Sequence, residues 1–302
     1  MRNRKREANN LSVYPIILSQ KQFAHKDELT YPFEERGLQF GDGVYEVIRI
    51  YEGRTHLLEE HVERLFRSAE AIHLSLDYTV DELVKTLEKL ITENKMTSDG
   101  KIYLQVTRGS ARRDHVFPDE SVEPNVYAYI EDLPRNLASL QSGVSTITHE
   151  DIRWDLCHIK SLNLLPNVLA KQAAKEQGSF EAILHENGTV TEASSANVFL
   201  IKDGKIYTHP ATEKILRGCV RMKVFELAEN LDLPLIEESF TIEDIQQADE
   251  MFLTSTTAEV MPIVKVDDIQ IANGTPGEIT RKLQAAYEED AQITRSTIIE
   301  TA

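Results

Sequence analysis

The sequence has little cysteine, with only Cys157 and Cys219 among its 302 residues, and the two do not form a CxxC motif. So few cysteines exclude a disulfide framework like those of small secreted domains, and they do not supply a zinc site. The histidines show no ligand spacing, so we expect no metal site of another kind. The cysteine content indicates a reducing compartment, and we expect a cytoplasmic protein.

The sequence also lacks long apolar runs and any excess of positive charge. No segment is apolar over enough residues to span a bilayer. Lys and Arg number 33 against 50 Asp and Glu, giving a formal net charge of -17. An acidic surface disfavours nucleic acid and anionic membranes as partners, although a local basic pocket can hold a small anion. Residues 1–12 are basic with no apolar segment after them, so we expect a disordered tail rather than a secretory signal.

The hydrophobic content, 41% of the residues, is enough for more than one core. Hydrophobic patterns predict helices and strand hairpins in both halves, which favours two α+β domains over an alternating βαβ series. We expect a smaller N-terminal domain over 13–132 and a larger C-terminal domain over 144–302. The segment 133–143, with Pro134 and little periodicity, is predicted to be the linker between them.

Lys160 is the first candidate for chemistry, because it lies in an unusual place for a lysine. Trp154, Leu156 and Ile159 are apolar, with charged or polar residues among them, which predicts a short, half-buried strand that ends at Lys160. Solvated lysines normally lie on polar surfaces. A lysine desolvated by apolar neighbours can act as an amine nucleophile and form a Schiff base with an aldehyde. The alternative is a structural lysine whose ammonium group reaches water past the strand end.

Two further segments suit a flat, phosphorylated ligand. Glu192 is predicted to close a strand next to small residues, so its carboxylate can approach a pyridine ring and keep the ring nitrogen protonated. Gly218 precedes a predicted helix, whose first N–H groups can bind a phosphate. Ser255 and Thr256, at the end of a predicted strand, offer hydroxyl donors. The alternatives are a solvated glutamate and an ordinary junction between loop and helix.

The N-terminal half offers side chains suited to anions. Arg64, on a predicted helix, can clamp a phosphate, although Glu60 lies four residues earlier in ion-pair position. Arg113 and His115 lie in a predicted loop, and an arginine with a second donor two residues away suits a carboxylate. Tyr45, on a predicted strand, can add a phenol to the same carboxylate. The alternative for the loop is ordinary surface charge.

Seven segments occur in the order found in one enzyme family: 40–46 (FGDGVYE), 60–65 (EHVERL), 113–115, 159–165 (IKSLNLL), 188–195 (GTVTEASS), 215–218 (ILRG) and 254–257 (TSTT). Together they resemble the fold-type IV pyridoxal-phosphate enzymes, and among these the D-amino acid aminotransferases. The resemblance extends from about Glu35 to Leu283. It implies a two-domain α+β architecture with the active site at the domain interface and pyridoxal 5'-phosphate as cofactor. The implied reaction is ping-pong transamination between a D-amino acid, such as D-alanine, and a 2-oxo acid, such as 2-oxoglutarate.

The resemblance also implies a role for each candidate residue. Lys160 would carry the Schiff base and move a proton between the substrate Cα and the cofactor C4' carbon, while Glu192 would pair with the pyridinium nitrogen. Tyr45, Arg113 and His115 would bind the substrate α-carboxylate, the last two from the neighbouring subunit of a homodimer. The other implied cofactor contacts are Arg64, the backbone of Cys219 and Val220, and Thr256 at the phosphate, Leu216 against the ring, and Ser195 and Ser255 in the pocket.

Two features depart from the family pattern. Val220 stands where relatives often have threonine, so only its N–H can contact the phosphate, and the segment before Val13 is longer than in relatives. Alternatives on the same fold are a branched-chain L-amino acid aminotransferase, an aminodeoxychorismate lyase and an (R)-amine transaminase. The Arg113 and His115 pair favours the D-amino acid enzymes. A non-catalytic cofactor-binding protein is expected to lack the lysine or the pyridinium carboxylate, and both are present.

Overall fold

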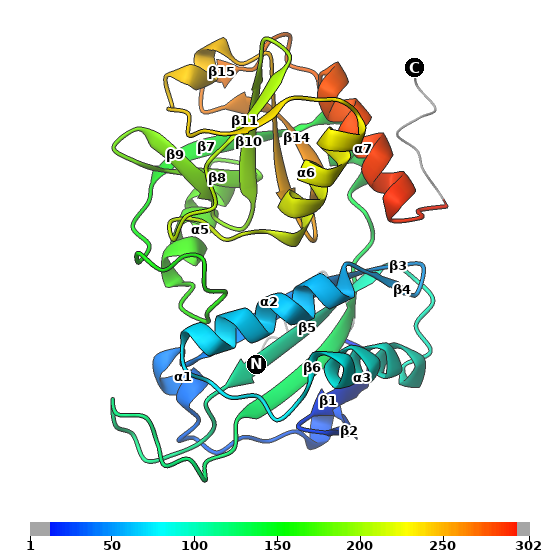
Figure 1. Ribbon diagram of the computed structural model, residues 1–302, viewed down its shortest axis with the longest axis vertical. Coiled ribbons are helices and arrows are strands. Elements are labelled where there is room, and N and C mark those ends of the chain that lie inside the picture. The colour runs from blue at the N-terminus through cyan, green and yellow to red at the C-terminus, as the bar shows by residue number, and fades with distance from the viewer. Residues whose placement is uncertain (1–12, 295–302) are drawn as a thin grey trace, which may run out of the picture. The chain divides into compact units, whose positions relative to one another are not determined.

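The computed structural model describes residues 13–294, which form two compact units (Figure 1). The division between them falls after Pro134, except that residues 70–72 group with the second unit. The predicted tail, residues 1–12, lies outside the described residues. Each unit combines helices with a sheet, as the α+β prediction requires. Among the described helices, none is long and apolar enough to cross a membrane.

The first unit is built on a six-stranded antiparallel sheet in the order β2-β1-β6-β5-β3-β4. Three α-helices and a short 3-10 helix, Lys26–Glu28, complete the unit. The strands are β1 (Ile16–Ser19), β2 (Gln22–His25), β3 (Gly43–Tyr51), β4 (Arg54–His56), β5 (Gly100–Thr107) and β6 (Asn125–Asp132), and the helices are α1 (Arg36–Phe40), α2 (Leu58–Ala71) and α3 (Val80–Glu93).

Local sequence signals explain where these helices begin. A capping box opens α3: Thr79 N donates to Glu82 Oε2 at 2.8 Å, and Glu82 N donates to Thr79 Oγ1 at 3.2 Å. Hydrophobic periodicity does not indicate helix α1. There the Glu35 carboxylate caps the helix by accepting from Leu38 N at 2.8 Å. A five-residue helix is too short to show hydrophobic periodicity.

The second unit is built on a nine-stranded mixed sheet in the order β12-β11-β10-β13-β14-β7-β8-β9, with β15 paired to β14. β7 runs parallel to β8 and β14, and β11 parallel to β12. A short 3-10 helix covers Asp244–Gln247. The strands are β7 (Val144–Glu150), β8 (Glu181–Glu186), β9 (Thr189–Ala193), β10 (Asn197–Lys202), β11 (Lys205–Thr208), β12 (Leu235–Glu237), β13 (Glu250–Ser255), β14 (Glu259–Val266) and β15 (Ile269–Gln270), and the helices are α4 (Leu137–Ser142), α5 (Leu165–Glu176), α6 (Cys219–Asn230) and α7 (Glu278–Asp290).

The structure adds a helix to the segment predicted as a linker and corrects one predicted strand. The segment predicted to be a linker contains α4, which buries Leu140 and is capped by the Asn136 side chain. The strand predicted over 154–159 is wrong, because this stretch is irregular and the preceding strand, β7, ends at Glu150. Trp154 and Leu156 are 41% and 40% exposed, so their spacing does not mark a buried sheet face.

Candidate active site

Lys160 lies in the irregular segment between β7 and α5 rather than at a strand end. Its neighbours Ile159 and Ser161 are 6% and 5% exposed, while Lys160 itself is half-buried. Helix α5 begins five residues later, with Pro166 in its first turn. The lysine therefore lies on an anchored loop whose flanking residues are fixed in the core.

Glu192 lies near the end of β9, and its carboxylate is buried. Oε1 contacts Arg153 Nη1, while Oε2 accepts from Asn197 Nδ2 at 3.0 Å and from Leu216 N at 3.1 Å. Burial raises the pKa of Glu192, and the neighbouring Arg153 cation opposes that rise. A carboxylate offers about four acceptor positions, so one further donor, such as a pyridinium N–H, fits beside these three.

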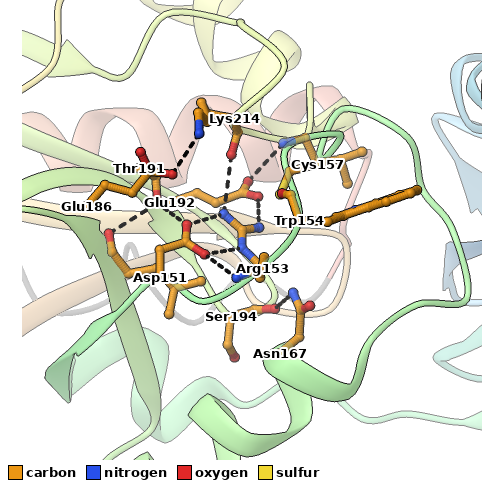
Figure 2. Close-up of polar contacts among 12 residues, drawn as sticks. Asp151, Arg153, Trp154, Cys157, Asn167, Glu186, Thr191, Glu192, Ser194 and Lys214 are labelled. Carbon is orange, nitrogen blue, oxygen red and sulfur yellow. Dashed lines mark hydrogen bonds and ion pairs between the residues drawn. The ribbon is translucent and has the colours of Figure 1, made fainter.

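Arg153 is the central cation of this cluster, and the sequence did not single it out. Figure 2 shows its guanidinium between Asp151 and Glu192. Nε and Nη2 donate to the two oxygens of Asp151 at 2.9 and 2.8 Å, and Thr191 Oγ1 adds a bond to Asp151 Oδ2 at 2.8 Å. Burial raises the pKa of Asp151, but the hydrogen bonds and charge of Arg153 outweigh it, so the pKa is lowered. Asp151 thus balances the cation while Arg153 keeps one donor on Glu192.

Asn197, the first residue of β10, joins Glu192 to the loop that precedes α6. Its Nδ2 donates to Glu192 Oε2 and also to Leu216 O at 2.8 Å. Leu216 N donates to the same Glu192 oxygen. The backbone of Leu216 is therefore held at its N–H by Glu192 and at its carbonyl by Asn197. Leu216, expected to pack against the cofactor ring, is therefore placed beside the carboxylate expected to contact the ring nitrogen.

The start of α6 has the features of a phosphate site. Its N-cap, Gly218, provides no side-chain cap for the first helical N–H groups, and Cys219 and Val220 are buried. A Cβ at Gly218 would lie 2.3 Å from Asn197 Oδ1, so a larger residue there would displace the Asn197 amide. Thr254, the cross-strand partner of Asn197, has a buried hydroxyl with no hydrogen-bond partner among the described residues. Uncapped amides with a nearby unpaired hydroxyl fit a bound phosphate.

The predicted hydroxyl residues lie at the ends of strands in the same unit. Ser255 is the last residue of β13, and its Oγ accepts from Ala258 N at 3.1 Å. Thr256 follows in the turn to β14. Ser195 lies between β9 and β10, where its Oγ donates to Glu181 Oε2 at 2.7 Å. These residues flank the strands that carry Glu192 and Asn197.

Strand β3 of the first unit carries a predicted residue on one face and fixes another from the opposite face. Tyr45 is half-buried, and its ring stacks on Tyr103 with centroids 6.0 Å apart. Glu46, fully buried, pairs with Arg64 Nε at 2.7 Å and Nη2 at 2.8 Å, and with His61 Nδ1 at 2.7 Å. Burial raises the pKa of Glu46, but Arg64 and His61 lower it by more. Arg64 is therefore held by Glu46, a partner that the sequence did not indicate.

Arg113 and His115 are exposed and lie against one aromatic ring. The Arg113 guanidinium carbon is 4.9 Å from the centre of the Phe40 ring, and the His115 ring is 5.7 Å from it. Arg36, also absent from the predicted set, holds their loop by donating from Nη1 to Asp114 O at 2.8 Å. The loop thus presents two adjacent donors, while their role with a substrate carboxylate stays a prediction.

Comparison with known proteins identifies the family. The model of the amino-transferase class IV family matches residues 43–266. The chain belongs to the class IV aminotransferases. This aminotransferase is 46% identical to the D-alanine aminotransferase of Staphylococcus epidermidis (strain ATCC 12228) over 271 residues, 90% of this chain and 96% of that one. Identity to the D-alanine aminotransferase of Staphylococcus aureus (strain N315) is also 46%, over 268 residues, 89% of this chain and 95% of that one.

Solved structures share the fold of this class IV aminotransferase. The branched-chain aminotransferase of Thermoproteus uzoniensis with norvaline is similar with a TM-score of 0.85 and 26% identity, over 94% of this chain and 97% of that one. The branched-chain amino acid aminotransferase of Thermobaculum terrenum, in its PLP-form, has a TM-score of 0.83 and 25% identity, over 93% of this chain and 95% of that one. This likeness confirms the fold-type IV, α+β architecture. The cofactor is pyridoxal 5'-phosphate, and the buried carboxylate and uncapped helix start of the second unit fit its ring nitrogen and its phosphate.

Proposed function

We propose that this enzyme transfers the amino group of a D-amino acid, such as D-alanine, to a 2-oxo acid, such as 2-oxoglutarate. The observation that carries the proposal is the 46% identity to D-alanine aminotransferases, against 26% to a branched-chain enzyme of the same fold. The net charge of -17 and the two cysteines support a cytoplasmic location.

The chain's own groups can perform the proton transfers of this reaction. When bound, pyridoxal 5'-phosphate supplies an electron sink that acidifies the substrate Cα–H bond. Lys160 Nζ would take the proton from the substrate Cα as a general base and then donate it to the C4' carbon of the cofactor as a general acid. Glu192, held by Arg153 and Asn197, keeps a proton at the ring nitrogen. The proposed remaining contacts are Arg64, Cys219 N, Val220 N and Thr256 for the phosphate, Leu216 for the ring, and Ser195 and Ser255 for the pocket lining.

Tyr45, Arg113 and His115 are proposed to bind the substrate α-carboxylate, with Arg113 and His115 contributed across a homodimer interface. Both lie in an exposed loop whose neighbouring apolar side chains are unusually accessible. Large exposed apolar groups of this kind mark protein interfaces. Four of them support a second copy of the chain at this surface: Phe33 (77% exposed), Leu38 (78%), Val116 (72%) and Phe117 (53%).

Borohydride reduction tests the attachment of the cofactor. The purified protein is expected to be yellow, and reduction followed by peptide mapping should find the cofactor on Lys160, because a lysine amine and an aldehyde form a reducible bond. Lys160→Ala should hold cofactor only reversibly and lose transamination. A colourless protein without a reducible adduct would overturn the proposal.

Arg113→Ala tests the carboxylate-binding loop. Loss of a hydrogen-bonded cation should raise the KM of amino acids on the order of ten- to a hundredfold while leaving cofactor content unchanged. Arg112→Ala, in the same exposed loop, is the matched control and should alter KM by less than about twofold. Equal effects of the two variants would remove Arg113 from the substrate site.

A further inference from the structure

Arg49 of β3 is a buried cation without a counter-charge. Its side chain is among the largest that are fully buried, with the residue 1% exposed. None of its three guanidinium nitrogens has a hydrogen-bond partner among the described residues. The guanidinium group lies instead over the aromatic ring of Tyr51, whose centre is 4.9 Å from the guanidinium carbon. A ring face attracts a cation but satisfies none of its five N–H donors.

Other buried arginines of the chain do not share this condition. Each of six pairs with a carboxylate at 2.9 Å or less, as expected from the cost of burying an unpaired charge. They are Arg36 with Asp42, Arg64 with Glu46, Arg108 with Asp42, Arg135 with Glu259, Arg153 with Asp151, and Arg221 with Glu237. Arg49 therefore departs from the chain's own rule for buried guanidinium groups.

The neighbours of Arg49 on its sheet face do not neutralise it. Strand register places His56 of β4 and Lys101 of β5 directly beside it, and Glu131 of β6 beyond Lys101. Glu131 already pairs with Lys101 at 2.9 Å. The row across the sheet thus reads histidine, arginine, lysine and glutamate, with the single carboxylate engaged by the lysine. An incoming anion would meet net positive charge at Arg49.

Arg49 shares its sheet face with Tyr45, the residue proposed to contact the substrate α-carboxylate. Side chains of a strand alternate between faces, so Tyr45, Val47 and Arg49 lie in one line on β3. Four residues at about 3.3 Å each separate the Cα atoms of Tyr45 and Arg49 by about 13 Å. Both side chains are long: that of Tyr45 stacks on Tyr103, that of Arg49 lies against Tyr51, and the short Val47 side chain lies between them in the line. The line has a polar group at each end and an apolar middle.

We propose that Arg49 binds the distal carboxylate of dicarboxylic substrates, the class that includes 2-oxoglutarate and D-glutamate. This inference rests on the proposed transamination. It names the residue that would make the enzyme prefer substrates with an acidic side chain. The planar guanidinium fork matches a carboxylate in bidentate geometry, and the methylene chain of such a substrate suits Val47. Arg49 thereby acts in substrate specificity rather than in proton transfer.

Acceptor kinetics of the holoenzyme test the inference. With D-alanine as donor, Arg49→Met should raise the KM for 2-oxoglutarate on the order of ten- to a hundredfold, because a charged hydrogen-bonded pair is lost. The KM for 2-oxobutyrate, which has one carboxylate, should stay within about twofold. Arg49→Lys should give an intermediate KM for 2-oxoglutarate, since it keeps the charge but not the fork. Equal changes for both acceptors, or no change for either, would overturn the inference.

A binding measurement separates this inference from the proposed reaction. Glutarate carries two carboxylates but neither an oxo group nor an amine, so it binds without turnover. Glutarate should raise the melting temperature of wild-type holoenzyme more than butyrate does, and Arg49→Met should abolish the difference. Arg54→Met, on the same sheet with a side chain 47% exposed, should retain it. Equal shifts with the two ligands in the wild type would contradict the inference. Failure of D-alanine transamination with a normal glutarate shift would instead overturn only the proposed function.

Discussion

Asn197 links several parts of the proposed cofactor site through one side chain. Its amide contacts both Glu192 and Leu216 O, and its Oδ1 faces Gly218. Asn197→Ala should raise the dissociation constant of pyridoxal 5'-phosphate about tenfold, because a hydrogen bond to a charged group is lost. An absorbance titration measures this constant. Asn167→Ala, which removes a donor from Ser194 O instead, should change it much less, and equal losses would contradict the role of Asn197.

Arg153 predicts a pH-dependent stability. Burial raises the pKa of Glu192, and without Arg153 it should rise further. A carboxyl whose pKa is higher in the folded than in the unfolded state destabilises the fold when ionised, and this penalty disappears as pH falls through the folded pKa. Arg153→Met should therefore cost about 3–5 kcal/mol at neutral pH and less at acidic pH. Urea unfolding at both pH values measures this, and a deficit independent of pH would contradict it.

Among the elements, α2 is attached to β3 through Glu46, Arg64 and His61. The pKa of Glu46 is lowered in the fold, so its stabilisation is complete above the ordinary glutamate pKa and is lost as pH falls toward the lower value. Glu46→Gln should reduce the free energy of unfolding by about 3–5 kcal/mol at neutral pH, with a smaller deficit in acid.

The matched control for Glu46→Gln is Glu63→Gln. Glu63 pairs with Arg67 on α2 at 3.4 Å, with both side chains more than half exposed. Its loss should change the free energy of unfolding by less than about 1 kcal/mol, measured in the same urea titrations. Similar losses for Glu46→Gln and Glu63→Gln would show that burial of the Glu46 cluster does not stabilise the unit.

Elements with local signals were predictable from the sequence. The capping box of α3 and the Asn187–Gly188 turn, with φ of +49° and +87°, follow from residues within a few positions of each other. The segment 154–159 was mistaken for a strand because the conformation of this part of the chain depends on long-range contacts, such as that of Arg153 with Glu192, 39 residues away. Periodicity contains no information about such a contact. The short helix α4 escaped detection because its six residues are too few to show a helical period, and Leu140 is its one fully buried side chain.

Some residues of the candidate site were predictable from the sequence and others were not. Ordered motifs singled out Lys160, Glu192 and Gly218, since each has a distinctive residue in a distinctive local setting. Asn197 and Arg153 were missed, because an asparagine and an arginine are ordinary in sequence and acquire their function from hydrogen bonds to residues distant in the chain. Such partners of a motif residue become visible only when the fold brings segments distant in sequence together.

For the whole molecule, the four exposed apolar side chains near Arg113, namely those of Phe33, Leu38, Val116 and Phe117, predict a homodimer. Val116→Glu combined with Leu38→Glu should shift the protein toward monomer in sedimentation velocity, because charge would replace apolar surface that is 72% and 78% exposed. The monomer should lose turnover while retaining bound cofactor, since the residues proposed to contact the cofactor all belong to one copy of the chain. A monomeric wild-type protein would contradict the prediction.

The central claim concerns the substrate: this class IV aminotransferase acts on D-amino acids. The most direct measurement is the rate of amino transfer to 2-oxoglutarate from D-alanine and from L-leucine, with enzyme, cofactor and acceptor held constant. The account predicts faster turnover of D-alanine. Faster turnover of L-leucine would contradict it and assign the enzyme to the branched-chain aminotransferases.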